Sequence, residues 1–298
     1  MNAGALESGA VTGTLAGPQN GADTGGDPMI SEPPEGTVER WAWEYVVTTD
    51  LGHKLAPPKV PSRWEPSPPS RRIPRPGRPA EIRVVPRAPK APGPDAIRVP
   101  QKRALLVHTF LHHELQATEL MAWAVLAFSD APRPFRGGLL HIAMDEVRHM
   151  RLYSEQLAGL GYRFGDFPVR DWFWERVPSA RAPADFVAVM GVGLEGANLD
   201  HTRRFAERFR AIGDEAGARI QEQVGEEEIP HVRFARKWLK RWTGSDDFGT
   251  WLSHLPAPLS PILMRGKPLD REARRRAGLG EPFLDQLEAW TETATLKA

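Results

Sequence analysis

The sequence contains no cysteine, which excludes disulfides, thiolate-bound metals, iron–sulfur clusters and cysteine nucleophiles. It also lacks an excess of charge of either sign, because 39 basic residues face 38 acidic ones and leave a formal net charge of +1. That balance removes any argument from overall charge for binding to nucleic acids or membranes. No apolar run reaches the length of about 18 residues that a membrane helix needs. The first residues have neither the basic flank nor the apolar stretch of a secretory signal. We therefore expect a cytoplasmic protein.

Apolar residues are plentiful enough to form a core. Hydrophobic residues make up 41% of the 298 residues and charged residues 26%, which is typical of a folded soluble domain. Without thiolates, a bound metal would have to be held by histidine and carboxylate. Such ligands favour iron or manganese over structural zinc.

The N-terminal third is predicted to lie outside the main domain. Residues 1–36 are rich in small and polar residues without apolar periodicity, and we predict a disordered tail there. Residues 37–100 are predicted to form a proline-rich basic arm. Between Pro57 and Pro100 there are 14 prolines, ten Lys or Arg and three Asp or Glu. Proline fixes φ and lacks an N–H, so we expect extended chain. A strap across an acidic bundle surface, or a loose tether, is favoured. The alternative, an arm for RNA or another polyanion, is disfavoured because few aromatic residues are interleaved.

The rest of the chain has a helical pattern, and we predict an all-α fold. The four predicted helices cover residues 101–128, 134–160, 184–212 and 215–242. Two helical hairpins joined by one long crossover are the layout of a ferritin-like four-helix bundle, which we assign to residues 101–243. The crossover contains the aromatic stretch Asp171–Arg176, expected to cover an apolar flank of the bundle. Residues 244–298 are predicted to form an irregular tail that packs on the outside of the bundle.

Glutamate and histidine stand three residues apart in two of the predicted helices. Glu146 and His149 belong to the second helix, and Glu228 and His231 to the fourth. Three residues are about one helical turn, so each carboxylate and its imidazole project from the same face. One such pair is close to chance, whereas two pairs on alternate helices of a bundle predict a two-metal site.

A two-metal bundle site also needs one acid from each remaining helix. The first helix offers Glu114 and Glu119, and the third offers Glu195 and Asp200. We prefer Glu114 and Glu195, because they stand at distances from the interhelical turns similar to those of the glutamates on the partner helices. Glu119 and Asp200 are equally symmetric, and they stay open as the alternative ligands or as residues that orient ligands.

Chain spacing supports this prediction, since Glu114 precedes Glu146 by 32 residues and Glu195 precedes Glu228 by 33. Such near equality is the sign of an internal repeat, as a site with pseudo-twofold symmetry requires. Four carboxylates and two neutral imidazoles carry four negative charges, which two divalent cations would balance. We expect Glu146 and Glu228 to bridge the two metals.

Further residues are predicted to support the ligands. Asp145 and Glu227 each precede a bridging glutamate, where an acid can accept a hydrogen bond from a histidine on a neighbouring helix and fix its tautomer. Tyr153 stands four residues after His149, so we expect it either to lie on the metal face of the helix or only to pack in the core. We interpret the remaining helical histidines as core or surface residues: His108, His112, His113, His141 and His201.

The segments HHELQATELMAW, DEVRHMRLY, LEGANLD and EEEIPHV, in this order and spacing, resemble the ferritin-like di-iron carboxylate superfamily. More closely, they resemble a bacterial branch of it whose domain has no known function, with a similarity that extends from about Pro76 into the C-terminal region. The resemblance implies two bridged metals that activate dioxygen or peroxide. It does not imply a substrate.

We therefore expect an enzyme, a di-iron oxidase or monooxygenase that uses two iron ions and dioxygen on a small organic substrate. A mixed manganese–iron pair is the alternative cofactor. Electrons would come from an external donor, because the chain has no flavin or nicotinamide fingerprint and no cysteine for an iron–sulfur cluster. The alternative function is a ferroxidase or iron-handling protein, and a further one is a helical binding protein with a vestigial metal site.

Overall fold

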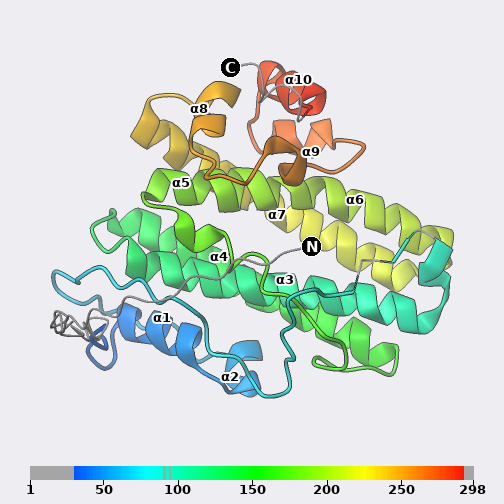
Figure 1. The fold of residues 1–298 in the computed structure, drawn as a ribbon, viewed down its shortest axis with the longest axis horizontal. Coiled ribbons are helices and arrows are strands. Elements are labelled where there is room, and N and C mark those ends of the chain that lie inside the picture. Colours follow the sequence, from blue (N-terminus) through cyan, green and yellow to red (C-terminus); the bar gives the residue numbers. More distant parts are fainter. Residues whose placement is uncertain (1–29, 90–91, 94, 292–298) are drawn as a thin grey trace, which may run out of the picture. The chain divides into compact units, whose positions relative to one another are not determined.

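Four long helical segments make up the centre of the fold in the computed structural model, which describes residues 30–89, 92–93 and 95–291 (Figure 1). They are α3 (Pro100–Ala127), α4 (Arg133–Gly159), a third segment in three parts, and α7 (Glu215–Thr243). The third segment consists of α5 (Pro183–Val187), the π-helix η3 (Ala188–Glu195) and α6 (Gly196–Ala211). These bounds lie within about two residues of the predicted ones, and the predicted all-α bundle is confirmed.

Local sequence explains where the bundle helices begin and end. The side chain of Asp214 caps α7 by accepting a hydrogen bond from the backbone N–H of Gly217, at 2.9 Å. At the other end of α7, Gly244 adopts a left-handed conformation with φ of +81°, which glycine reaches without steric penalty. Proline at the first position of α3 removes an N–H that would have no partner there.

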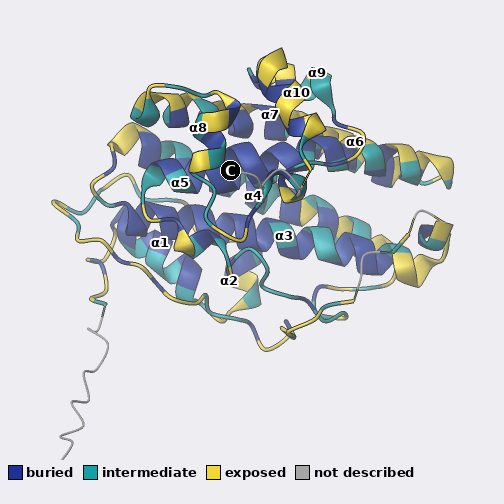
Figure 2. Cartoon of the chain, turned by 45° about the horizontal axis from the view of Figure 1, so that its top comes forward, coloured by how far each residue is buried: buried dark blue, intermediate teal, exposed yellow. Residues whose placement is uncertain are grey.

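The helices pair as two hairpins that bury their apolar faces against each other. Helix α3 packs on α4, α6 packs on α7, and α4 contacts α7 across the centre. Figure 2 shows buried residues along the inward faces of these helices. Among the described residues, the only strand-like pairing is a bridge between Val84 and Val169. No helix in the described part of the chain is both long and apolar enough to cross a membrane.

The π-helix is a departure from the predicted continuous α-helix over residues 184–212. At its end, the backbone N–H of Gly196 donates to the carbonyl of Gly191, five residues earlier. Gly191 is also where α7 comes very close, because a Cβ placed on it would lie 2.1 Å from the Cβ of Ala235. Widened turns of this kind are frequent at functional sites, and this one ends at Glu195.

The predicted arm, residues 37–100, is only partly extended. Its first part forms α1 (Val38–Val47) and α2 (Leu51–Leu55), and α1 packs on α3. The expectation of extended chain was based on Pro57–Pro100, and no proline occurs between Val38 and Ala56 to prevent helices there. A short 3₁₀ turn, η1 (Asp95–Arg98), precedes α3.

Beyond α2 the proline-rich chain lies along the bundle as a strap. The backbone N–H of Arg71 donates to the carbonyl of Leu126 at 3.0 Å, and the indole N–H of Trp123 donates to the carbonyl of Ile73 at 3.1 Å. Of the predicted disordered tail, residues 1–29 lie outside the described residues. Residues 31–36 instead contact the fold, since the Arg71 side chain donates to the carbonyl of Ser31 at 2.7 Å.

The C-terminal segment contains short helices where an irregular tail was predicted. They are α8 (Phe248–Ser253), the 3₁₀ turn η4 (Pro261–Met264), α9 (Arg271–Arg276) and α10 (Glu281–Ala289). Helix α9 contacts α6 and α7, and η4 contacts the π-helix. The segment therefore lies over the second hairpin, next to the part of the bundle that carries Glu195 (Figure 1).

Candidate metal centre

Four glutamates and two histidines from all four bundle segments meet in the interior. Each of the six side chains is buried, with at most 6% of its residue surface exposed. They are Glu114 on α3, Glu146 and His149 on α4, Glu195 at the end of η3, and Glu228 and His231 on α7. All six are the ligands preferred from the sequence, and we call them the carboxylate cluster.

The carboxylate cluster divides into two overlapping groups that could each hold a metal ion. One ligand atom from each of Glu114, Glu146, His149 and Glu228 lies within 4.8 Å of the others. The same holds for Glu146, Glu195, Glu228 and His231. The two groups share Glu146 and Glu228, while each has one glutamate and one histidine of its own.

Several carboxylate oxygens of the cluster have no hydrogen-bond partner among the described residues. Both oxygens of Glu195 are in this condition, and Oε1 of Glu146 has only a 3.2 Å ion-pair contact with Nδ1 of His231. A buried carboxylate without a donor or a cation is unfavourable by several kcal/mol in real proteins, so it is expected to bind a cation or a proton. The cluster therefore has the chemistry of a cation site.

Each histidine of the cluster is held between two acids. His149 places Nδ1 3.0 Å from Oε2 of Glu146 and Nε2 2.9 Å from Oε2 of Glu227. His231 likewise places Nε2 3.0 Å from Oδ2 of Asp145. Because Glu227 and Asp145 lie on the opposite helix in each case, each Nε2 can donate outward while Nδ1 faces the cluster. This is the arrangement that fixes the tautomer of a metal-binding histidine.

Arg148 holds the two outer acids in place. Its guanidinium contacts Asp145 at 2.7 Å and Glu227 at 2.8 Å, and so ties α4 to α7. Asp145 and Glu227 thus accept the histidine hydrogen bonds that the sequence analysis assigned to them.

The alternative ligands Glu119 and Asp200 are buried but belong to neither group. Glu119 pairs with Lys54 at 2.8 Å and with Arg78, and it accepts a hydrogen bond from the indole N–H of Trp174 at 2.8 Å. Asp200 pairs with Arg274 at 2.8 Å and accepts hydrogen bonds from two backbone N–H groups of the C-terminal segment. Their negative charges are already compensated. The structure therefore brings Glu114 and Glu195 to the cluster and turns Glu119 and Asp200 away from it.

Proton affinities in the carboxylate cluster are strongly perturbed. Burial, together with the negative charge of Glu146, raises the pKa of Glu114 well above its usual range, and burial does the same for Glu195. Burial lowers the pKa of His149 and His231, but the neighbouring carboxylates outweigh it and raise both pKa values well above normal. Protons are therefore expected to occupy the metal-free cluster.

Because of these shifts, the metal-free protein is expected to lose stability as pH rises above about 6.5. A histidine whose folded pKa is raised contributes stability that is fully present below its unfolded pKa and is lost as pH rises through the folded pKa. The raised pKa values of Glu114 and Glu195 also make stability fall as pH rises, beginning at the unfolded glutamate pKa of about 4.3. Urea unfolding in chelator at several pH values would measure this. With zinc bound, stability should instead rise with pH, because the metal replaces the protons that occupy the metal-free cluster. Stability that stays level or rises without metal would contradict this prediction.

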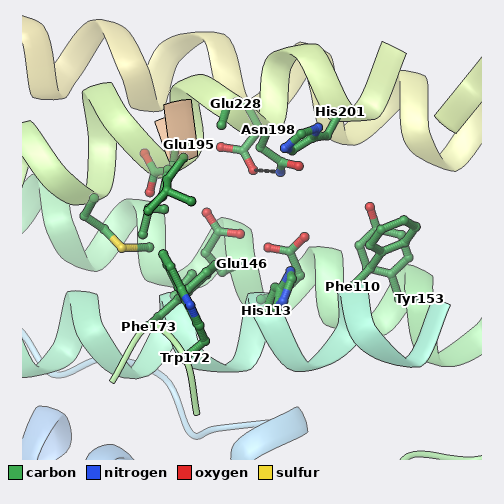
Figure 3. Close-up of a pocket in the computed structure, with 16 residues that line it drawn as sticks. Phe110, His113, Glu146, Tyr153, Trp172, Phe173, Glu195, Asn198, His201 and Glu228 are labelled. Atoms are coloured by element: carbon green, nitrogen blue, oxygen red, sulfur yellow. Dashed lines mark hydrogen bonds between the residues drawn. The ribbon is translucent and has the colours of Figure 1, made fainter. Parts of the chain in front are cut away.

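A pocket of about 220 Å³ lies directly beside the carboxylate cluster (Figure 3). Its walls include Phe110 and Tyr153 on one side and the crossover residues Trp172 and Phe173 on another. Tyr153 is buried, and its hydroxyl accepts a hydrogen bond from the side chain of Gln221 at 3.0 Å. The crossover aromatics therefore line a pocket at the carboxylate cluster rather than only covering an apolar flank.

Three polar residues of this pocket were not predicted from the sequence to lie at the site. Asn198 donates from Nδ2 to Oε1 of Glu228 at 2.9 Å. His113 and His201, interpreted above as core or surface histidines, both line the pocket. The spacing held a signal, because Asn198 and His201 follow Glu195 at intervals of three residues and so stay near one helix face.

Comparison with known proteins gives a family without an assigned function. A family model described as "Protein of unknown function (DUF455)" matches residues 39–285, which is most of the chain. An uncharacterized protein of Haemophilus influenzae (strain ATCC 51907 / DSM 11121 / KW20 / Rd) is 28% identical over 193 residues. That match covers 61% of this chain and 66% of the relative, just under two thirds of the relative's length. No solved structure matches.

Proposed function

This chain belongs to the DUF455 family, and we propose that it is a non-haem di-iron oxidoreductase of the ferritin-like kind, acting with dioxygen on a small organic substrate. The observation that carries the proposal is the pair of overlapping ligand groups that share Glu146 and Glu228. Two glutamates from single helices and two Glu-x-x-His pairs are the ligand set of di-iron and di-manganese carboxylate bundles.

The residues present fit two metal ions. Four carboxylates and two imidazoles would carry four negative charges, which two divalent cations neutralise. The oxygens of Glu195 are unpartnered donor atoms, and the Nδ1 atoms of both cluster histidines face the cluster, where they contact Glu146 and Glu228. Carboxylate and imidazole suit iron, and a manganese–iron pair has the same ligand preferences. One metal would be held by Glu114 and His149 and the other by Glu195 and His231, with Glu146 and Glu228 shared.

When bound, such metals supply Lewis acidity, one-electron redox chemistry and open positions for dioxygen. The protein's own residues then have separate tasks. Asp145 and Glu227 hold the histidine tautomers, and Asn198 orients the carboxylate of Glu228. The aromatic walls of the adjoining pocket exclude water from the space where a substrate would react. Electrons would come from an external donor.

The apolar pocket favours an organic substrate over iron storage or iron oxidation. A ferroxidase passes hydrated cations, whereas this pocket presents aromatic and aliphatic side chains next to the cluster.

With excess Fe(II) in air and no organic substrate, we expect oxygen consumption to stop after about one turnover per chain, because two metals fill the site. An oxygen electrode and a ferric absorbance assay would measure this, with a Glu195→Ala chain as the control for background oxidation. Sustained oxidation of many irons per chain, above that control, would instead identify an iron-handling protein.

A further inference from the structure

Two histidines face the pocket from opposite walls. Figure 3 shows His113, on α3, below the pocket and His201, on α6, above it, with the carboxylate cluster to one side. Among the described residues that line the pocket there is no lysine or arginine. If two divalent cations neutralise the four glutamates, the pocket as a whole carries no net charge, and it is suited to an uncharged ligand.

The hydrogen-bonding state of His201 follows from its neighbour. A guanidinium nitrogen of Arg204 lies 3.0 Å from Nδ1 of His201. Because a guanidinium only donates hydrogen bonds, Nδ1 must accept, and in a neutral ring the proton then resides on Nε2. Burial lowers the pKa of His201 to about 4, so the ring is neutral near pH 7. The Nε2–H is therefore the one N–H donor of this ring.

The pocket volume limits the size of the ligand. An apolar protein cavity of about 150 Å³ accepts benzene, so the 220 Å³ found here, part of which two bound metals would occupy, fits a molecule of at most about nine non-hydrogen atoms. Flat aromatic walls favour a ring. Phe173, for example, stacks on His113 with ring centroids 4.9 Å apart, and Phe110 lines the same pocket.

We propose that the pocket binds an uncharged single-ring organic molecule with an acceptor oxygen, such as a carbonyl, and that the Nε2–H of His201 donates to that oxygen. His201 is then a specificity-determining residue. This inference rests on the proposed function, because the pocket is electrically neutral only when both metals are bound.

Two molecules of nearly the same shape test this directly. Acetophenone carries a carbonyl oxygen where α-methylstyrene carries a methylene group. Binding of each to the anaerobic, Fe(II)-loaded full chain would be measured by calorimetry. We expect acetophenone to bind about fivefold more tightly, as one net hydrogen bond implies. His201→Phe should remove this preference, and His201→Gln, which keeps an N–H donor, should retain part of it. His141→Phe, at an exposed position on α4, is the matched control and should change nothing.

The outcomes separate this inference from the proposed function, since iron is titrated on the same samples. Two irons bound without acetophenone binding would overturn the inference and leave the proposed function in place. Failure to bind iron would overturn both. An equal affinity for the two molecules, or a preference that survives in folded His201→Phe, would overturn the role of His201. Tighter binding of the trimethylanilinium cation than of acetophenone would overturn the uncharged ligand class.

Discussion

Replacing Glu146 with alanine is expected to reduce anaerobic Fe(II) binding from about two ions per chain to less than one. Glu146 belongs to both ligand groups, and its two oxygens approach Nδ1 of His149 at 3.0 Å and Nδ1 of His231 at 3.2 Å. Removing this one carboxylate therefore damages both metal positions. Metal analysis after Fe(II) titration and desalting would measure the loss.

Two further variants serve as controls for Glu146→Ala. Glu114→Ala removes a ligand from one group only, so it should leave about one ion per chain. His141→Ala, on the exposed surface of α4, should bind iron like the unmodified chain. Circular dichroism would check that Glu146→Ala folds, because Glu146 contacts both cluster histidines and its loss leaves them without this partner. Two ions retained in Glu146→Ala, or His141→Ala being the more damaging change, would show that the ligands are assigned wrongly.

Arg274→Met is expected to lower the free energy of unfolding by about 3–5 kcal/mol. The Arg274 and Asp200 side chains are both fully buried, and their 2.8 Å ion pair joins α9 to α6. Methionine fills most of the space but leaves the Asp200 carboxylate buried without its cation. Denaturant unfolding of the two chains would measure the difference.

Arg276→Met is the matched control two residues further on. Arg276 pairs with Glu226, but both side chains are at least half exposed, so its loss should change stability by less than about 1 kcal/mol. Adding Asp200→Asn to Arg274→Met should recover part of the loss, because the orphaned group then carries no charge. If Arg274→Met and Arg276→Met destabilise the chain equally, the buried pair does not have the role assigned here.

The bundle and the six residues of the carboxylate cluster could be predicted from sequence because their signals are local. Helix ends are marked by residues such as Asp214 and Gly244, and Glu-x-x-His spacing reports a shared helix face. The preference for Glu114 over Glu119 rested on their distances from the interhelical turns, and it left Glu119 open as the alternative. What separates them in the structure is the position of Lys54 and Arg78, which come from another part of the chain and pair with Glu119.

Other features depended on packing that periodicity does not report. The π-helix before Glu195 is associated with the close approach of α7 at Gly191, not with a local helix signal. The pocket positions of His113 and His201 depend on the crossover and on the C-terminal segment, which close around them. The helices at the start of the arm were missed because the arm was characterised by its prolines, which begin again only at Pro57.

Glu119 and Asp200, the two buried acids outside the carboxylate cluster, also constrain how this protein can evolve. Glu119 is neutralised by the segment before the bundle and Asp200 by the segment after it. A recombination event that transferred residues 100–243 alone would deliver a bundle with two buried charges and none of their counterions. The bundle and both flanks are therefore expected to be inherited as one piece. Homologous proteins that lack one of these flanking segments should therefore carry a neutral residue in place of the acid that the segment neutralises.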